Sequence, residues 1–174
     1  MSETTYQVVR FSDDHDLSEF DCGHDIYNTW LREHAASSIR AGVCAVYLLI
    51  ERAEDRERVV GYFAINPTQV ATIEIPAKDT RGWPRTVPAW KIGKLAVHVD
   101  LRAKADIPWG RHLLRAAIET VLRACDVGGG KVIVVDPDDR ALVDFYVANG
   151  FSSCAAEGSL ACYLKVSTAR GLLG

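Results

Sequence analysis

The chain has 174 residues, of which 48% are hydrophobic and 25% are charged. This composition is typical of a globular protein and excludes disordered, collagen-like and fibrous proteins, and the length predicts one domain over residues 1–174. The longest apolar runs, such as residues 43–50, are far shorter than the roughly 20 residues that cross a bilayer. The first ten residues lack the pattern of a signal peptide, so we expect a cytoplasmic protein without a membrane span.

Charge is unevenly distributed along the chain, although the net charge is only -3. Residues 78–104 contain seven Lys or Arg against two Asp, whereas residues 1–30 contain seven carboxylates against one Arg. Such segments are usually solvated surface, but the cationic one could also bind a polyanionic ligand. The five cysteines form no C-x-x-C pair, so we interpret them as reduced thiols.

Hydrophobic periodicity and turn residues predict ten elements in chain order. Strands are expected at residues 6–11, 43–50, 59–65, 94–99, 131–135, 151–155 and 160–166, and helices at 26–38, 109–125 and 138–148. The segment 67–89 contains four prolines and is predicted to be mostly loop, with at most short strands. Strands first, followed by alternating strands and helices, predict an α/β (α+β) fold with a mostly antiparallel central sheet that has a parallel portion.

One segment has the pattern of an anion site. The strand Leu95-Ala96-Val97 is followed by a loop of small residues at 102–105 and then by a helix that begins near Gly110. Backbone N–H groups at a helix start, together with the helix dipole, suit a pyrophosphate, and nearby cations such as Arg102 and Arg111 would add charge. A purely structural strand-to-helix turn gives the same pattern.

The order of motifs resembles a known family. L-A-V, a small-residue loop, G-R-x-L-L, V-I-V-V-D and F-Y-x-x-x-G-F closely resemble the GNAT family of acetyl-CoA-dependent N-acetyltransferases. Upstream, F-D-C-G-H-D-I-Y-N-T-W-L-R-E-H-A at 20–35 and V-G-Y-F-A-I at 60–65 look like the GNAT toxins that acetylate aminoacyl-tRNA. The resemblance covers residues 8–166 and implies a GNAT-like mixed sheet, flanked by helices, with a splayed parallel portion.

The resemblance implies a set of acetyl-CoA contacts. These are Leu95, Ala96, Val97, Arg102, Ala103, Lys104, Ala105, Trp109, Gly110, Arg111 and Phe145. The chain departs from the family's pyrophosphate loop, because four residues instead of one separate Ala105 from Gly110. Among them Pro108 lacks an N–H donor and Asp106 would repel phosphate, so the loop either bulges around the cofactor or binds it poorly. Trp109 could stack on adenine, but packing on the core is favoured.

Tyr146 occupies the position of the family's general acid. A phenol is protonated at neutral pH and can give a proton to the departing thiolate of coenzyme A, although the same residue could be an ordinary core tyrosine. Backbone N–H groups of the L-A-V strand would polarise the acetyl carbonyl. An α-amino acceptor is already partly neutral near pH 8, so no strong base is needed, and His98 is a weaker candidate for that role. No histidine spacing indicates a metal site.

The acceptor implied by the toxin branch is the amino group of aminoacyl-tRNA. Four cations are the candidate tRNA contacts: Arg81, Arg85, Lys91 and Lys94. The resemblance also implies a toxin of a type II toxin-antitoxin pair, neutralised by a ribbon-helix-helix antitoxin and forming a homodimer. Two alternatives stay open: acetylation of a small-molecule amine or a protein N-terminus, which suits the acidic pI, and a non-catalytic binding module.

Overall fold

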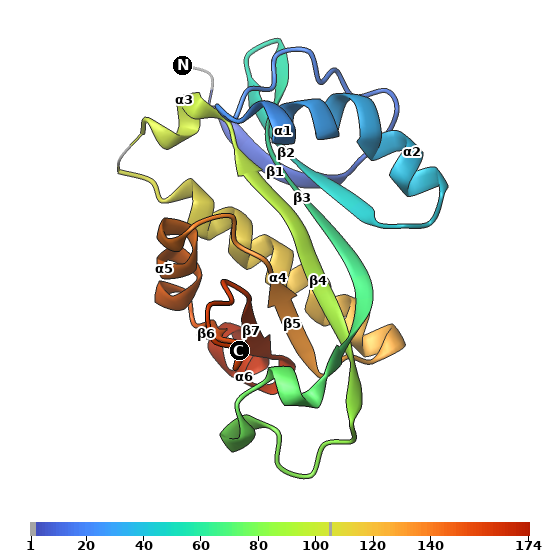
Figure 1. Cartoon of the computed structure of the whole chain (residues 1–174). Coiled ribbons are helices and arrows are strands. Elements are labelled where there is room, and N and C mark those ends of the chain that lie inside the picture. Colours follow the sequence, from blue (N-terminus) through green and yellow to red (C-terminus); the bar gives the residue numbers. More distant parts are fainter. Residues whose placement is uncertain (1–2, 105) are drawn as a thin grey trace. The chain divides into compact units, whose positions relative to one another are not determined.

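The computed structural model describes residues 3–104 and 106–174 (Figure 1). The chain divides into two compact units, each made of two segments. The first unit comprises Met1–Ile65 and Lys94–Ala117, and the second comprises Asn66–Gly93 and Ile118–Gly174. The single domain expected over residues 1–174 therefore stays a prediction.

The described residues form a seven-stranded sheet with the strand order β1-β2-β3-β4-β5-β7-β6. Its strands are β1 (Thr5–Arg10), β2 (Ala45–Ala53), β3 (Arg56–Ala71), β4 (Thr86–Val97), β5 (Val132–Val135), β6 (Ser152–Ser153) and β7 (Cys162–Lys165). The β4–β5 pair is parallel, whereas β1–β2, β2–β3, β5–β7 and β6–β7 are antiparallel. The predicted fold class, a mixed and mostly antiparallel sheet with helices, is thereby confirmed.

Nine helical segments accompany the strands in the described part of the chain. They are α1 (Asp25–Thr29), the π-helical turn η1 (Trp30–His34), α2 (Ala35–Arg40), the 3-10 turns η2 (Thr72–Glu74) and η3 (Ala77–Asp79), α3 (Val99–Arg102), α4 (Trp109–Gly128), α5 (Arg140–Ala148) and α6 (Val166–Leu173). Across residues 3–104 and 106–174, none of these helices has both the length and the apolar character needed to cross a membrane.

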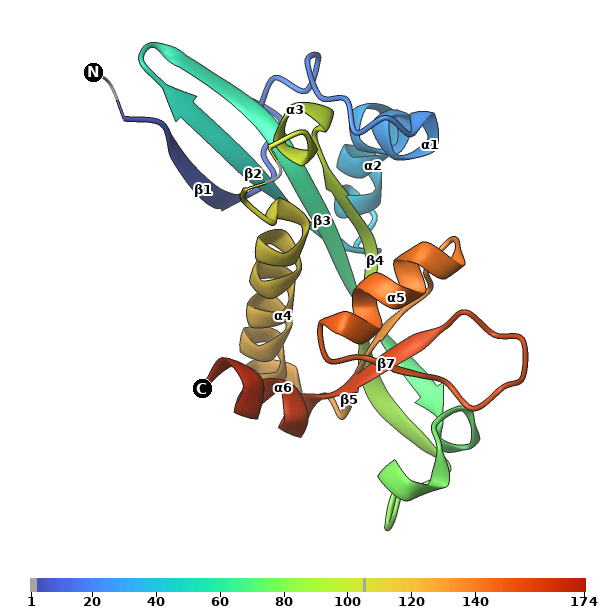
Figure 2. The same cartoon turned by 90° about the vertical axis from the view of Figure 1, so that its left-hand side faces the viewer.

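Alternation along β2 builds the core of the first unit. Leu48 and Ile50 belong to a buried cluster that also contains Leu31 of η1. Leu49 points to the other face, where it lies with Leu113 of α4 around Gly61. Figure 2 shows the corresponding arrangement, with α1 and α2 on one side of β2 and β3 and the start of α4 on the other. Because successive strand residues face opposite sides, one apolar strand can bury both of its faces.

The second unit has its own core, in which β4, β5 and β7 pack on the segment that joins β3 to β4. Its buried members are Val70, Ile75, Val87, Ala89, Val132 and Tyr163. The α5 helix packs beside β6 and β7, and α6 follows β7 without a loop. Asp139 caps α5 by accepting the backbone N–H of Leu142 at 2.9 Å, which is the usual role of Asp at a helix start.

The prediction that residues 67–89 are mostly loop, with at most short strands, holds for residues 72–85, whereas two long strands extend into the segment from its ends. The β3 strand continues through Pro67 to Ala71, and β4 begins at Thr86 and contains Pro88. Pro88 fits because the strand uses its carbonyl, which accepts the Lys131 N–H at 2.8 Å. Proline lacks only the donor, so it is tolerated where no N–H is needed. The short helix α3 and the terminal helix α6 were not predicted either.

Candidate active site

The second half of β4 has one unpaired edge. The backbone N–H of His98 donates to β3 at 2.8 Å. Because N–H groups alternate in direction along a strand, the N–H of Ala96 faces β3 as well, while those of Leu95 and Val97 face away from it. The pairing of β4 with β5 covers Ala89–Lys91 alone. Leu95 and Val97 therefore present the backbone donors that a ligand could use.

A second pair of free donors lies at the start of α4. The N–H of Trp109 donates to Ile107 at 2.9 Å, and that of His112 donates to Pro108 at 3.1 Å. Gly110 and Arg111, between them, donate no backbone hydrogen bond to any described residue. Unsatisfied N–H groups at a helix start are the ordinary ligands of phosphate, so this first turn fits a diphosphate.

Two described residues of the lengthened loop, Ile107 and Pro108, accept hydrogen bonds at this helix start. Ile107 closes a turn by donating to the carbonyl of Lys104 at 3.2 Å, and Pro108 contributes the carbonyl that opens the helix. Proline has no N–H, but a backbone N–H at this position would have no acceptor within the helix, so its absence costs the helix no hydrogen bond. Ala105, a predicted cofactor contact, lies outside the described residues.

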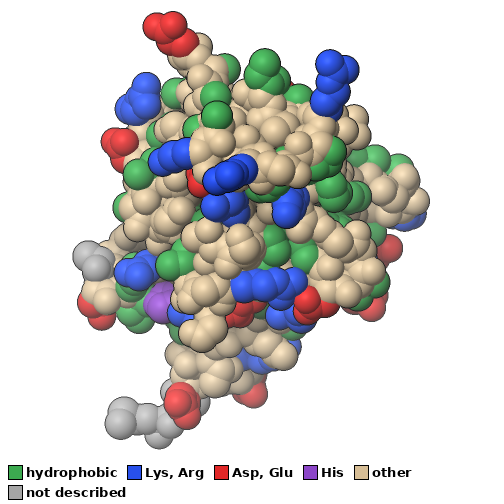
Figure 3. Space-filling view, turned by 90° about the horizontal axis from the view of Figure 1, so that it is seen from below, with side chains coloured by type: hydrophobic (Ala, Val, Ile, Leu, Met, Phe, Trp, Pro, Cys, Tyr) green, Lys and Arg blue, Asp and Glu red, His purple; other side chains and the backbone are tan. Residues whose placement is uncertain are grey.

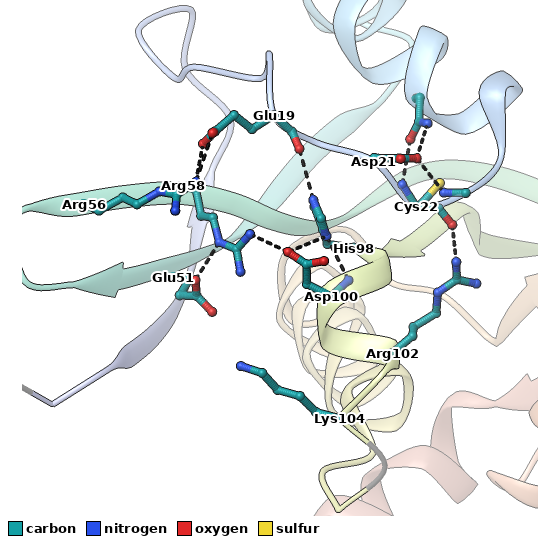
Figure 4. A network of polar contacts seen from close by, with 12 residues as sticks. Glu19, Asp21, Cys22, Glu51, Arg56, Arg58, His98, Asp100, Arg102 and Lys104 are labelled. Carbon is teal, nitrogen blue, oxygen red and sulfur yellow. Dashed lines mark hydrogen bonds and ion pairs between the residues drawn. The ribbon is translucent and has the colours of Figure 1, made fainter.

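The three cations predicted around the diphosphate, Arg102, Lys104 and Arg111, differ in their contacts, and Figure 4 shows the first two of them. Arg102 donates from Nη2 to the carbonyl of Cys22. Lys104 lies with Nζ 3.4 Å from the hydroxyl of Tyr6. Arg111 is exposed, and its side chain forms no hydrogen bond or ion pair with a described residue. Arg111 is thus the cation that is free to bind a ligand, whereas Arg102 fixes α3 to the loop before α1.

Replacing Arg102 and Arg111 separately should have opposite effects. We expect Arg102→Ala to lower the free energy of unfolding by about 1 kcal/mol, because the exposed guanidinium holds one charged hydrogen bond, and to change the Kd for acetyl-CoA little. We expect Arg111→Ala to leave stability unchanged and to weaken acetyl-CoA binding by about tenfold. Thermal unfolding and calorimetry measure the two effects. The reverse pattern would show that Arg102 binds the ligand.

His98 is a structural residue in this arrangement (Figure 4). Its side chain is buried, with Nδ1 accepting the backbone N–H of Asp100 at 3.0 Å and Nε2 lying 3.0 Å from the carbonyl of Glu19. Both ring nitrogens are therefore engaged, one as acceptor and the other as donor. Neither is available to take a proton from an amine, so His98 positions α3 rather than acting as a base.

Ion pairs surround His98 and keep its neighbours charged. Arg58 donates to Glu51 at 2.6 Å and to Asp100 at 2.9 Å. Burial would raise the pKa of the Glu51 carboxyl, but hydrogen bonds from Arg58 and Tyr6 outweigh it and the pKa is lowered. The pKa of Asp100 is lowered mainly by its hydrogen bond from Arg58. These carboxylates stay ionised at neutral pH, and their ion pairs with Arg58 stabilise the fold.

Tyr146, the predicted general acid, is a buried residue of α5 in the second unit. Its side chain is 7% exposed and lies edge-on to Phe145 and Phe151, with ring centroids 5.2 Å and 5.3 Å away. Burial raises the pKa of the phenol above its ordinary value, so the hydroxyl keeps its proton. No hydrogen bond to this hydroxyl is found among the described residues. A protonated and unpartnered phenol can donate to a ligand.

Trp109 packs on the protein, as favoured from the sequence. Its ring centroid lies 4.2 Å from that of Tyr6. Both rings line an apolar cavity of about 410 Å³ in the first unit, together with Val8, Leu49 and Leu113 among others. Within the described part of the chain the buried Nε1 of Trp109 has no hydrogen-bond partner.

The four predicted tRNA contacts lie in different surroundings. Arg81 and Arg85 are exposed in the second unit, where Lys91 forms an ion pair with Asp136 at 2.6 Å. Lys94 belongs to the first unit and places Nζ 5.2 Å from the ring centroid of Trp30. A hollow of about 370 Å³ lies beside Lys94 and was not predicted from the sequence. It is lined by Asp25, Ile26, Thr29, Trp30, His34 and Lys94. Two of these lining residues belong to the π-helical turn η1, and the sequence pattern gives no sign of such a turn.

No group of three or more His, Cys, Asp or Glu in the described residues could hold a metal ion. In the first unit, the donors that the structure presents are backbone N–H groups at the β4 edge and the α4 start, together with the exposed side chain of Arg111. This set fits a phosphate-bearing thioester better than a metal, since N–H groups bind anions and carbonyl oxygens.

Comparisons with known proteins agree with this chemistry, although no protein-family model matches the chain. The tRNA-acetylating toxin of Mycobacterium tuberculosis (strain ATCC 25618 / H37Rv) is 29% identical over 165 residues, which are 95% of each protein. The solved structure of a tyrosine-to-phenylalanine mutant of KacT superposes with a TM-score of 0.86 at 20% identity, covering 96% of this chain and 98% of KacT.

AtaT complexed with acetyl-methionyl-tRNAfMet superposes with a TM-score of 0.85 at 22% identity, covering 99% of this chain and 100% of AtaT. Another AtaT structure contains acetyl-CoA and the C-terminus of the antitoxin AtaR. At these identities the solved structures establish the fold. The chain has the fold of the KacT and AtaT toxins, and its resemblance to the toxin branch of the GNAT acetyltransferases is confirmed.

Proposed function

We propose that the protein is an acetyl-CoA-dependent N-acetyltransferase that acetylates the amino group of aminoacyl-tRNA and acts as the toxin of a type II toxin-antitoxin pair. The observation that carries this proposal is the similarity, over 95% of both chains, to a tRNA-acetylating toxin. The fold shared with AtaT, which has been solved with acetyl-methionyl-tRNAfMet, supports the same substrate. The AtaT complex with AtaR supports an antitoxin partner, for which we propose a ribbon-helix-helix protein.

The first unit supplies the donors for the cofactor. The N–H groups of Gly110 and Arg111 and the Arg111 guanidinium would hold the diphosphate, and the N–H groups of Leu95 and Val97 would bind the acetyl carbonyl oxygen. Acetyl-CoA, when bound, supplies the activated thioester. Donors fixed in a strand and a helix need no rearrangement as negative charge develops on that oxygen, which is why they favour the transition state.

Tyr146 would supply the proton for the leaving group. The neutral amine attacks the acetyl carbon, a C–N bond forms and the C–S bond breaks. The thiolate takes the phenolic proton of Tyr146, and the proton that the amine loses passes to water and restores the phenol. An α-amino group has a pKa of about 8, so roughly a tenth of it is the neutral nucleophile at pH 7 and about half at pH 8. Positioning of this amine beside the acetyl carbon can therefore supply much of the rate without a strong base.

The rate of transfer should depend on pH in a way that reflects these two groups. We expect initial rates, corrected for spontaneous loss of the aminoacyl ester, to rise to about pH 8 as the amine is deprotonated. Burial raises the pKa of Tyr146, so the acid form persists to higher pH and the rate should not fall again below about pH 10. A decline centred near neutral pH would contradict a phenolic acid.

Transfer of labelled acetyl groups tests the proposal. The protein is incubated with labelled acetyl-CoA and with charged tRNA, uncharged tRNA, free amino acids or polyamines. The proposed function predicts label in the charged tRNA and little in the other acceptors. Label in free amines alone would favour the small-molecule reaction, and a failure to bind acetyl-CoA at millimolar concentration would favour a non-catalytic module.

A further inference from the structure

The second unit contains a cationic groove whose lining includes none of the residues assigned to acetyl transfer. It has a volume of about 550 Å³. Five cations line it, from η3, the loop that follows, the start of β5, the end of β7 and α6: Lys78, Arg81, Lys131, Lys165 and Arg170. Trp83 and the start of α6 complete the lining. Figure 3 shows Lys and Arg side chains gathered near the middle of the face seen from below.

Only part of this positive charge is neutralised by the protein. Asp79, the one carboxylate of the lining, accepts from the hydroxyl of Tyr163 and pairs with Lys165 at 3.1 Å. Arg170 pairs with Asp126 at 2.8 Å. Lys78 and Arg81, by contrast, form no ion pair with any described residue. The groove thus holds an excess of positive charge in a protein whose net charge is -3.

The third cation without a carboxylate partner is Lys131, which lies over an aromatic ring. Its Nζ is 5.4 Å from the ring centroid of Trp83. The backbone of Lys131 is fixed on both sides, since its N–H donates to Pro88 at 2.8 Å and its carbonyl accepts from Val166 at 3.0 Å. Trp83 is half-buried and packs against the core of the second unit. The groove therefore combines a cation on a fixed backbone, further cations without carboxylate partners, and the indole of Trp83.

This combination is typical of surfaces that bind nucleic acid. Each phosphate contacted by Lys or Arg releases bound counterions, which favours binding and makes it depend on salt. An aromatic ring beside the cations can stack on an unpaired base, as in proteins that bind single strands or RNA ends. The cations come from segments far apart in the sequence, so the fold, rather than one basic run, creates the surface.

We propose that this groove binds the phosphate backbone of the tRNA substrate, with Lys78, Arg81 and Lys131 as the phosphate contacts. The inference rests on the proposed function for the identity of the RNA, and it adds a binding surface to that function. Arg81 was predicted as a tRNA contact from the sequence, whereas Lys78 and Lys131 were not. An acidic protein segment could also bind these cations, but the indole of Trp83 beside them favours RNA, whose bases stack on aromatic rings.

The test compares two triple variants with the same loss of charge. The groove variant is Lys78→Ala with Arg81→Ala and Lys131→Ala. The control replaces three exposed arginines of the first unit by alanine: Arg40, Arg52 and Arg56. Binding of uncharged tRNA is measured by fluorescence anisotropy at several salt concentrations, and thermal unfolding verifies that both variants are folded.

We expect the groove variant to bind tRNA at least about tenfold more weakly and to reduce the slope of log K against log salt by about 2, while the control changes neither. Wild-type affinity and slope in the groove variant would overturn the inference, as would an equal loss in the control. An acidic protein as the true occupant would leave tRNA binding unchanged, which is the same negative result.

The measurement separates the inference from the proposed function. If wild-type protein binds tRNA through the groove but transfers no acetyl group to charged tRNA, the groove stands and the proposed function fails. If wild-type protein acetylates charged tRNA and the groove variant does so with the same KM, the proposed function stands and the groove fails.

Discussion

Replacing Tyr146 by phenylalanine should lower kcat for acetyl transfer by about 10²- to 10⁴-fold, the range that a positioned general acid contributes. The variant removes one hydroxyl and keeps the ring that packs on Phe145 and Phe151. The Kd for acetyl-CoA and the unfolding temperature should therefore stay close to those of the wild type. Steady-state kinetics with charged tRNA, together with calorimetry, measure the two quantities separately.

Tyr47→Phe is the matched control for this experiment. Tyr47 lies in β2, stacks on Phe63 with ring centroids 5.1 Å apart and belongs to no predicted site. Loss of its hydroxyl should leave kcat unchanged. Equal kcat values for wild type and the Tyr146 variant would remove Tyr146 from the chemistry and leave it as a core residue.

Asn28→Ala should lower the free energy of unfolding by about 2 kcal/mol, because it leaves the buried N–H of Cys22 without a partner and removes the hydrogen bond to Asp21. Asn28 is 4% exposed, accepts the backbone N–H of Cys22 and donates to Asp21, each at 2.9 Å. Asp21 also accepts the N–H of Gly23 at 2.8 Å, and these bonds lower the pKa of its carboxyl. One side chain thus fixes the loop that leads into α1.

Chemical denaturation measures this loss, and a decrease of roughly 5–10 °C in Tm should accompany it. Asn66→Ala is the control, because the exposed amide of Asn66 donates only to the neighbouring carbonyl of Pro67. We expect the control to change stability by less than about 0.5 kcal/mol. An Asn28 variant as stable as the control would show that the loop does not depend on this amide.

The parts of the fold that the sequence predicted correctly are those with a strong local pattern. The helix at 109–125 was found because a loop with Pro108 precedes it and the glycines at 128–130 follow it. The strands at 43–50 and 59–65 were found because two β-rich runs flank a polar turn. The ends of the proline-rich segment were predicted less well, because prolines usually interrupt strands. Pro67 and Pro88 lie in strands at positions where no N–H is required.

The parts of the site that the sequence missed depend on contacts between distant residues. The hydrogen bond from Arg102 to Cys22 joins residues 80 positions apart, so a motif alone assigned the guanidinium to the cofactor. The carbonyl of Glu19 meets the ring of His98 across 79 positions. No periodicity or spacing encodes such pairs, whereas the order of motifs was enough to indicate the resemblance to the GNAT toxins.

The cationic groove also depends on residues that are distant in the sequence. The excess of positive charge in residues 78–104 correctly indicated a basic surface, but the structure pairs Lys91 with Asp136 and places Lys94 over Trp30. Lys131 joins the groove from beyond the basic segment. Local charge counts therefore predicted that a basic surface exists but not which cations form it.

Mass spectrometry of the acetylated substrate tests the central claim most directly. Charged tRNA is incubated with the protein and acetyl-CoA and then digested with a nuclease that releases the 3′-terminal aminoacyl-adenosine. The account predicts that this fragment gains the mass of one acetyl group on its amino acid, and that the Tyr146 variant produces far less of it in the same time. An unmodified aminoacyl-adenosine, or an acetyl group found only on a nucleobase, would contradict it.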